Sequence, residues 1–531
     1  MGVKVHTYQK APMSTAYQQI NDAESPFAPA GEKFAVLVRH MQSPEALRMT
    51  HGELEADVVA RTRDIARDVV QGHLNLRAAA ERPVRVVGAE GVERPERRRS
   101  FRRLRLVVGE VEVPRLLYQA PGVRGLSPQD AALSLPKDCF SMGVRRRVAE
   151  EVCWGSFDHA VERLASTTGA SIAKRQVEQL ARASAVDFEA FYSARTAEPE
   201  GDEQLLVLTF DGAGLIMRTE ALRAETRREA EKAAKMPKAW PERTKSGEKP
   251  NRKRMAEVAA VYGISRFVRT ADDIMGELAS IKGVRPADRP VRPRPVNKRV
   301  WASVQREMAD VIEEGFREAL RRDPDGRRRW VVLVDGQQQQ LHAIQAAAKR
   351  HGVHLTIVCD FIHVMEYLWK AANCFHAAGS DDARKWVSEH ARMLLEGADP
   401  SQVAAGMRRS ATLRRLEVRA AVDKCARYLL GRRDYVRYGD ALAEGFPIAS
   451  GVIEGACRHL VRDRLDCCGA RWSVEGAEAV LKIRALTTSG DFEAYWALHL
   501  AREHERNHLS AYAGAAPPDP IPRPRLRLVK S

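Results

Sequence analysis

The sequence has little of what marks a secreted or membrane-spanning protein. Its eight cysteines are scattered and form no Cys-x-x-Cys pair, which argues against a disulfide framework or a cysteine zinc site. No apolar run approaches the roughly 20 residues that a transmembrane helix needs. The N-terminal segment contains no apolar core like that of a signal peptide. We therefore expect reduced thiols and a cytoplasmic location.

The phosphate-binding loop Gly-x-x-x-x-Gly-Lys-Ser/Thr is also absent, so we expect no ATP requirement. Positive charge is what the sequence has in excess, since 86 Lys and Arg against 70 Asp and Glu give a formal net charge of +16. An excess of that size favours a polyanionic partner, and nucleic acid and an acidic membrane surface both qualify on charge alone. The hydrophobic share of 44% indicates a folded chain.

A dense basic run, ERPERRRSFRRLR, occupies residues 93–105. The strand-like residues that follow it, around Gly109, favour a β-hairpin. Such a hairpin either grips phosphates or presents an ordinary solvated face, and both interpretations fit the sequence.

A second basic element is predicted within a helical region at 143–190. Gly169 is placed to end one helix, and Ser171 can cap the next. The second helix would expose Lys174 and Arg175, which is the plan of a DNA-binding helix-turn-helix. An ordinary helical hairpin is the alternative.

Three continuous apolar runs have the length and composition of buried strands. They cover residues 205–212, 330–336 and 353–360, and they lead into Asp211, Asp335 and Asp360. A carboxylate at the end of a buried strand is costly unless it faces a solvent crevice or a metal. Ligands of open α/β sheets commonly lie outside the strand ends, so these acids are candidate site residues.

The segments between and after these strands carry weaker signals. AEVAAVYGI and SRFVRT are two further strand candidates, and the charged stretch 219–254 predicts a helix with an exposed loop. The Pro- and Arg-rich segment 284–299 predicts an extended basic linker before a helix at 301–321. Residues 364–445 show helical periodicity throughout, which predicts an all-α insertion.

Asp211 and Asp335 on neighbouring strands are expected to bind two Mg²⁺ ions, which prefer oxygen ligands. Two such ions about 4 Å apart can hold the attacking and leaving oxygens of a phosphodiester in line. Mn²⁺, also an oxygen-seeking octahedral ion, is expected to substitute.

A helix can supply the third carboxylate that closes such a site. Glu454 lies in the first turns of a helix that begins near Ser450, with Arg458 and Arg462 at i+4 and i+8. This stripe of one carboxylate and two guanidiniums would suit a scissile phosphate and its neighbours. The alternative is a surface glutamate paired with Arg458.

Several segments resemble the transposases of bacterial insertion sequences of the ISKra type, within the Mutator-like group of DDE transposases. The resemblance covers roughly residues 130–510 and rests on FDGAGLIMR, LVDG and DFIHVMEYLWKAA. It is strongest in PIASGVIEGACRHLVRDR and in GARWSVEGAEAVLKIRALTTSGDFEAYW.

The resemblance implies an RNase H-like catalytic core in which a helical insertion separates the second aspartate from the glutamate. It implies that Asp211, Asp335 and Glu454 are the catalytic and metal-binding residues, and the 454 − 335 = 119 residues between the last two leave room for the insertion. It also implies that Asp360 and His363 form an accessory motif, which favours Asp335 over Asp360 as second catalytic aspartate.

Other roles for these residues stay open at this level. Asp360 could simply cap the helix that follows it, and His363 could orient the site, touch DNA or pack in the core. Trp472 could stack on an unpaired base, or it could be a core tryptophan. A literal His-Glu-x-x-His at 504–508 has no further His or Glu after it, so a zinc protease is not expected.

The expected fold is an α/β catalytic core, an RNase H-like mixed sheet with flanking helices, carrying an all-α insertion and a mainly α N-terminal DNA-binding region. The expected parts begin with a region at 1–118 that holds a mobile arm (1–31), a helix (44–80) and the basic hairpin, followed by a helical region with the helix-turn-helix at 119–200. The core is expected at 201–363 and, together with a C-terminal helix, at 446–512, with the all-α insertion at 364–445 and a disordered tail at 513–531.

The expected function is Mg²⁺-dependent DNA cleavage at element ends followed by strand transfer into target DNA. The partners would be double-stranded DNA, as terminal repeats and target, and further copies of the chain on that DNA, with no membrane partner and a nucleoid-associated location. Two alternatives use the same residues: a catalytically silent DNA-binding protein derived from a transposase, and an RNase H-like nuclease or resolvase that cleaves without joining.

Overall fold

The computed structural model describes residues 25–169, 171–196, 201, 203–235, 252–279, 291–467 and 469–521. The chain divides into two compact units, one of Met1–Asp187 with Glu493–Ser531 and one of Phe188–Phe492. The helix at 492–507 therefore groups with the N-terminal unit, whereas the sequence analysis kept it with the core. Over the described residues, no helix combines the length and apolarity that crossing a bilayer requires.

The unit of Phe188–Phe492 is built on a five-stranded mixed sheet in the order β5-β4-β3-β6-β7. Its strands are β3 (Leu205–Ile216), β4 (Lys253–Ile264), β5 (Val296–Ser303), β6 (Trp330–Val334) and β7 (Leu355–Cys359). β3, β6 and β7 run parallel, and β4 pairs antiparallel with both β3 and β5. The expected α/β class and mixed sheet are confirmed. The central strands β3 and β6 are largely apolar, as expected for buried strands.

Three details of the sheet differ from the sequence prediction. β3 does not end at Asp211 but continues to Ile216, because β4 pairs with it along its whole length. The strand β5 occupies the end of the predicted linker and the start of the predicted helix, whose apolar residues Val300 and Trp301 are buried in the sheet. SRFVRT forms no strand, and Phe267 instead donates its backbone N–H to Gly445.

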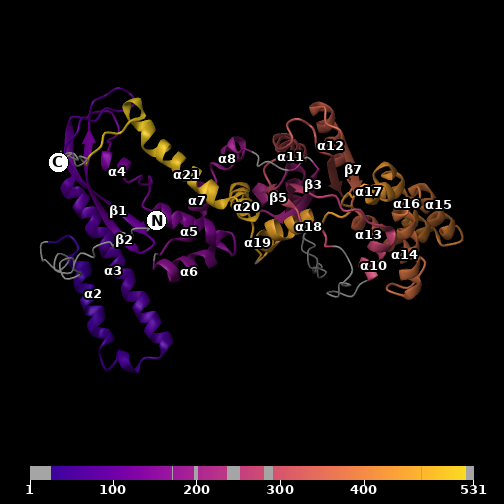
Figure 1. Ribbon diagram of the computed structural model, residues 1–531, viewed down its shortest axis with the longest axis horizontal. Helices are drawn as coiled ribbons and strands as arrows, with labels where there is room; N and C mark the ends of the chain where they lie inside the picture. Colours follow the sequence, from indigo (N-terminus) through magenta and orange to yellow (C-terminus); the bar gives the residue numbers. More distant parts are fainter. Residues whose placement is uncertain are drawn as a thin grey trace, which may run out of the picture. The chain divides into compact units, whose positions relative to one another are not determined.

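Helices surround the sheet, and α11 and α18 both pack against β3 and β4. They are α8 (Phe188–Ala194), α9 (Ala224–Lys235), α10 (Ala271–Ala279), α11 (Met308–Arg322), α12 (Gln338–His351), α18 (Gly451–Ala456), α19 (Asp463–Leu465) and α20 (Val474–Ser489). The segment predicted as an all-α insertion is helical, in α13 (Phe361–Ala372), α14 (Asp381–Leu395), α15 (Pro400–Ala411), α16 (Leu416–Leu430) and α17 (Tyr438–Ala443). Figure 1 shows α14 to α17 gathered on the β7 side of the sheet.

The other unit combines helices with a two-stranded ribbon. Its elements are α2 (Ala28–Met41), α3 (His51–Ala80), β1 (Glu96–Leu106), β2 (Gly109–Gln119), α4 (Pro128–Ala132), α5 (Met142–Val152), α6 (Phe157–Thr168), α7 (Lys174–Ala183) and α21 (Phe492–Asn507). α2 and α3 lie side by side (Figure 1), so helix begins inside the predicted arm. Residues 1–24 of that arm and 522–531 of the predicted tail lie outside the described residues.

Candidate active site

The first two acids lie on adjacent parallel strands. Thr209 of β3 is in register with Leu333 of β6, and Asp211 and Asp335 each follow two residues later. Asp211 is half-buried within β3, whereas Asp335 comes directly after the last residue of β6. The register therefore brings Asp211 and Asp335, which are 124 residues apart in the sequence (335 − 211), close together near the carboxyl end of β6.

Glu454 reaches the same region from α18. Ser450 ends the preceding loop, and its carbonyl accepts the backbone N–H of Glu454 at 3.1 Å, which opens the helix. Burial raises the pKa of the Glu454 carboxyl, and the charges of Asp360 and Asp211 raise it further. Asp211 is thus close enough to Glu454 to raise the pKa of its carboxyl.

The surroundings of Asp211 disfavour the charged form of its carboxyl. Burial raises the pKa of its carboxyl and the nearby Asp335 adds to the rise, while the N–H of Gly212 (2.7 Å) and the charge of Arg462 oppose it. In the described part of a chain so rich in arginine, neither Asp211, Asp335 nor Glu454 forms an ion pair. Glu454 also makes no side-chain hydrogen bond there. Uncompensated carboxylates of this kind suit a cation.

The fit to a metal can be tested on the donors themselves. Carboxylate oxygens are the ligands that Mg²⁺ prefers. As they stand, however, no three His, Cys, Asp or Glu side chains of the described residues are close enough to hold one ion together. The donor chemistry fits a hard divalent cation, and binding of one ion by all three acids would require them to draw closer together.

Asp360 has a different environment. It is the N-cap of α13, and its Oδ1 accepts the N–H groups of Ile362 at 2.6 Å and His363 at 3.3 Å. Its Oδ2 accepts the N–H of Ser450 at 2.8 Å and also the hydroxyl of that residue. Both oxygens are therefore used inside the protein, and the carboxylate ties β7 to the residue that opens the helix of Glu454.

His363 lies beside the acids without being part of the core. Its ring packs edge-on against Tyr367 and Tyr428, at centroid distances of 5.6 and 5.8 Å. Its charge lowers the pKa of Glu454. The His363 side chain is one-third exposed, so the alternative of a histidine packed fully in the core is wrong, and a role at the site stays a prediction.

Sequence reasoning missed Cys457. The helix of Glu454 continues as a π-helix from Cys457 to Arg462, and the Cys457 thiol donates to Asp211 Oδ2 at 3.2 Å. π-helical turns are rare and often occur at functional sites. No pattern in one sequence marks such a turn, but the i+3 position relative to Glu454 could have suggested the contact.

The π-helical turn also changes the predicted arginine stripe. Six residues with wider spacing break the i+4 and i+8 alignment on which the stripe depended. Arg462 is near enough to Asp211 to lower its pKa, whereas the exposed Arg458 lies 3.9 Å from Asp463. The expectation of Glu454, Arg458 and Arg462 on one straight α-helical face is wrong, although Arg462 does lie at the acidic site.

The helical insertion contributes directly to the site. Tyr428 of α16 donates its hydroxyl to the carbonyl of Asp335 at 2.8 Å, and Arg432 donates to the carbonyl of Gly336 at 2.7 Å. The guanidinium of Arg432 also lies over the Tyr428 ring, 4.1 Å from its centroid. These two side chains hold the loop that carries Asp335, a role that no local pattern in the sequence could indicate.

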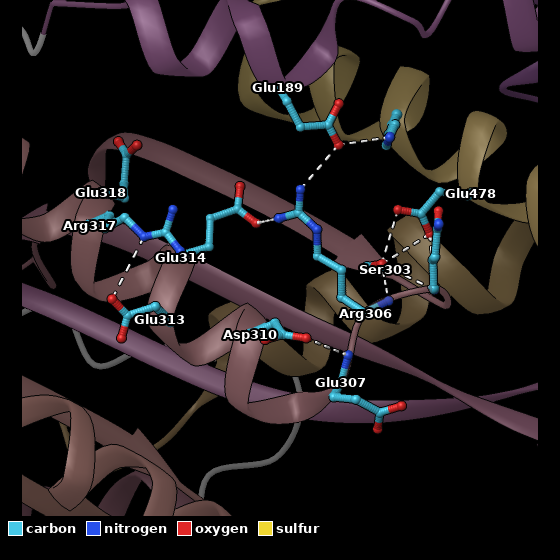
Figure 2. Close-up of polar contacts among 12 residues, drawn as sticks. Glu189, Ser303, Arg306, Glu307, Asp310, Glu313, Glu314, Arg317, Glu318 and Glu478 are labelled. Carbon is cyan, nitrogen blue, oxygen red and sulfur yellow. Dashed lines mark hydrogen bonds and ion pairs between the residues drawn. The ribbon is translucent and has the colours of Figure 1, made fainter.

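A second group of buried charges shows the contrast with the acidic site. Glu478 of α20 accepts the hydroxyl of Ser303 at 3.0 Å and the N–H of Val304 at 2.9 Å, and Figure 2 shows its carboxylate turned toward the end of β5. Beside it, Arg306 joins Glu314 at 2.5 Å and Glu189 at 3.2 Å. Arg306 thus has two carboxylate partners, and the carboxylate of Glu478 is satisfied by hydrogen bonds, which indicates a structural role for the cluster.

Trp472 belongs to the core. Its indole is 4% exposed and donates to the carbonyl of Leu465 at 2.9 Å, with Arg464 over the ring. Its backbone also pairs with the end of β3, since its carbonyl accepts the N–H of Arg218. Burial leaves no face of this ring free to stack on a base, so the predicted DNA contact of Trp472 is wrong and the core alternative holds.

In the other unit, α5, α6 and α7 pack on one another as a three-helix group. Gly169 ends α6 in the left-handed conformation, as predicted, but α7 begins after Ala173 rather than at a Ser171 cap. Lys174 and Arg175 are exposed, and Lys174 forms an ion pair with Asp158 at 2.6 Å. Two packed helices with exposed basic residues at the start of the second are compatible with a helix-turn-helix, and DNA binding by them stays a prediction.

The His-Glu-x-x-His motif at the end of α21 has no metal-site geometry. The buried His508 bonds the carbonyl of Leu135 through Nε2 at 2.7 Å. That nitrogen is therefore engaged within the protein.

Replacing Asp211 by Asn should stabilise the metal-free protein at neutral pH. Burial raises the pKa of Asp211, so folding favours the protonated form, and its contribution to stability is lost as pH rises from the ordinary aspartate range through the raised value. Asn stays neutral throughout. Thermal melts should show a higher midpoint for Asp211→Asn at pH 7 and no difference at strongly acidic pH.

The effect of Mg²⁺ on the melting midpoint provides a second measurement on the same two proteins. Mg²⁺ should raise the melting midpoint of the wild type and leave that of Asp211→Asn unchanged, because a ligand stabilises only the form that binds it. Equal Mg²⁺ shifts in the two proteins would contradict the assignment of Asp211 as a metal ligand.

Comparison with known proteins gives no further guide, since the chain matches no protein-family model and no curated protein.

Proposed function

We propose that the protein is a DDE transposase with an RNase H-like core, which cleaves DNA at element ends and transfers the freed strand into target DNA. What supports the proposal is that Asp335 lies near Asp211 and Asp211 lies near Glu454, although the three acids come from distant segments. None of the three forms an ion pair with another described residue. Such a set of carboxylates suits divalent-metal chemistry on a phosphodiester.

Asp211, Asp335 and Glu454 would hold two Mg²⁺ ions, which, when bound, supply activation of the attacking oxygen and stabilisation of the leaving oxygen. The chain's own residues prepare this site. Asp360 fixes the start of the Glu454 helix, and Tyr428 and Arg432 fix the loop of Asp335. Arg462 adds a positive charge beside Asp211, where a phosphate could be attracted.

The experiment that tests this function uses labelled DNA from the element ends, with Mg²⁺ and an unlabelled target duplex. Nicking followed by joining to the target is the expected result. Nicking without joining would indicate a nuclease or resolvase, and binding without nicking would indicate a silent DNA-binding protein. Mn²⁺ is expected to support the same products.

DNA binding by the helix-turn-helix gives a separate prediction. Changing Lys174 and Arg175 to Ala should weaken binding to element ends and lower the dependence of log K on log salt by about 1–2, because each lost phosphate contact removes about 0.9. Arg175→Ala should have the larger effect, since Lys174 already pairs with Asp158. Binding titrations at several salt concentrations provide the measurement, and an unchanged slope would show that the helical hairpin is structural.

A further inference from the structure

The basic ribbon formed by β1 and β2 has one outer edge that is hydrogen-bonded to other segments and one outer edge that is partly open. In β2, the backbone N–H groups of Glu112, Leu116 and Tyr118 bond to the side chains of Gln71 and Glu81 and to the carbonyl of Leu126. These bonds occupy the outer edge of β2. A duplex or another strand therefore cannot approach the ribbon's backbone from that side.

The outer edge of β1 is different. Arg105 uses its outward N–H and C=O on Cys139 and Ser141. Backbone groups alternate along an antiparallel pair, so those of Arg103, Phe101 and Arg99 point the same way. No described residue bonds to the outward groups of these three, which leaves donors available along the first part of β1.

The side chains of this open edge are cationic and largely free. Arg97, Arg98 and Arg99 are exposed and form no hydrogen bond or ion pair with a described residue. Phe101 follows them with 67% of its surface exposed, opposite Pro114 of β2. A large apolar ring left in water among unpaired arginines is costly for a merely solvated face and suits a partner with both phosphates and apolar surface.

The ribbon is also held firmly at its other end. Leu104, Val111 and Val113 are buried against Leu74 of α3. Arg105 donates to the carbonyl of Ser171 at 3.1 Å, in the turn before α7. The exposed arginines therefore project from a fixed base that is bonded to the helix-turn-helix.

We propose that the outer edge of β1, from Arg97 to Arg103, binds duplex DNA. Arg97, Arg98 and Arg99 contact backbone phosphates, and Phe101 packs into the groove against the bases. A two-stranded ribbon has the width that the major groove accepts. A duplex fits better than a single strand, because platforms for single strands stack successive bases on several aromatic rings, whereas β1 offers Phe101 alone.

The test measures DNA binding by the full chain in metal-free buffer, so it does not depend on cleavage or on the acidic triad. Arg97, Arg98 and Arg99 are changed together to Gln, and a labelled duplex is titrated at several salt concentrations. The expected result is at least about a tenfold loss of affinity at low salt and a slope lowered by about 2–3, since three phosphate contacts are lost.

A charge-matched variant carries the same loss of three exposed arginines elsewhere in the same unit, at Arg39, Arg48 and Arg82. It should bind nearly as the wild type does. An equal loss in both variants would overturn the proposal, because it would show an effect of net charge alone. An unchanged slope in the ribbon variant would also overturn it.

Substitutions of Phe101 provide an independent test of the proposal. Phe101→Ala should weaken duplex binding several-fold without changing the salt slope, because no charge is removed, and Phe101→Trp should retain binding. A defect seen only with a labelled single strand of the same length would overturn the duplex assignment. Since Phe101 is exposed, thermal melts of these variants should match the wild type, which separates binding from folding.

Discussion

Asp211→Asn, Asp335→Asn and Glu454→Gln should each fold, bind end DNA and fail to cleave it. Each change removes one negative charge from a group of carboxylates that form no ion pair with a described residue, while leaving the shape of the side chain in place. A loss of about 10³-fold or more is expected in the rate of nicking, or about 4 kcal/mol of transition-state stabilisation, because one ligand of the metal site is lost. Single-turnover nicking with labelled end DNA provides the measurement.

Asp360→Asn is the matched control for this series. Both carboxylate oxygens of Asp360 accept hydrogen bonds, from the N–H groups of Ile362, His363 and Ser450. An amide in its place keeps part of the N-cap, so the Asp360→Asn protein should retain measurable cleavage. Cleavage that survives in Asp335→Asn and vanishes in Asp360→Asn would mean that Asp360 is the catalytic aspartate. Cleavage that survives in Glu454→Gln would contradict the DDE assignment as a whole.

Gly336→Ala should be nearly as damaging, although it removes no functional group. Gly336 has φ +85°, and a Cβ there would lie 2.6 Å from Cys359 Sγ and 2.8 Å from Arg432 Nε. Backbone strain and overpacking together should lower the free energy of unfolding by roughly 2–5 kcal/mol. Any shift of the loop moves Asp335, and a displacement of about 1 Å can cost about 10²-fold in rate.

Gly352→Ala is the control that separates strain from position. Gly352 also has a positive φ, +65°, but nothing lies within 4 Å of its Cβ position. It should lose about 1 kcal/mol of stability and no cleavage at a temperature where both variants are folded. Tyr428→Phe removes only the hydrogen bond to the Asp335 carbonyl and should slow nicking while sparing DNA binding. Full activity in Gly336→Ala would show that the loop is not a determinant of the site.

Local sequence patterns predicted much of the core. The runs that became β3, β6 and β7 are predominantly apolar, and that pattern results from burial, which is complete in β6, extends over most of β3 and covers the end of β7. β5 was missed because its first residues are polar and follow a Pro- and Arg-rich segment, and only pairing with β4 makes them a strand.

The same division applies to the candidate site. Asp211, Asp335 and Glu454 could be chosen from strand ends, helix spacing and resemblance. For Asp360, the helix N-cap was an open alternative and is confirmed, but its hydrogen bonds with Ser450 could not be predicted, because they join residues 90 apart in the sequence. Trp472 was misjudged for a related reason: an aromatic residue near a site is exposed or buried according to its neighbours, and here Leu465 and Arg464 enclose it.

The sequence by itself determined the α/β class, the choice of candidate acids and the excess of positive charge, because the sheet class and the charge depend on composition and short-range periodicity and the acids were chosen from strand ends, helix spacing and resemblance. Only the tertiary structure decided what holds the acids in place. Tyr428 and Arg432 lie about 90 residues after Asp335, and Cys457 lies 246 residues after Asp211. Contacts over such separations leave no periodic trace in the chain, since they arise when packing brings the segments together.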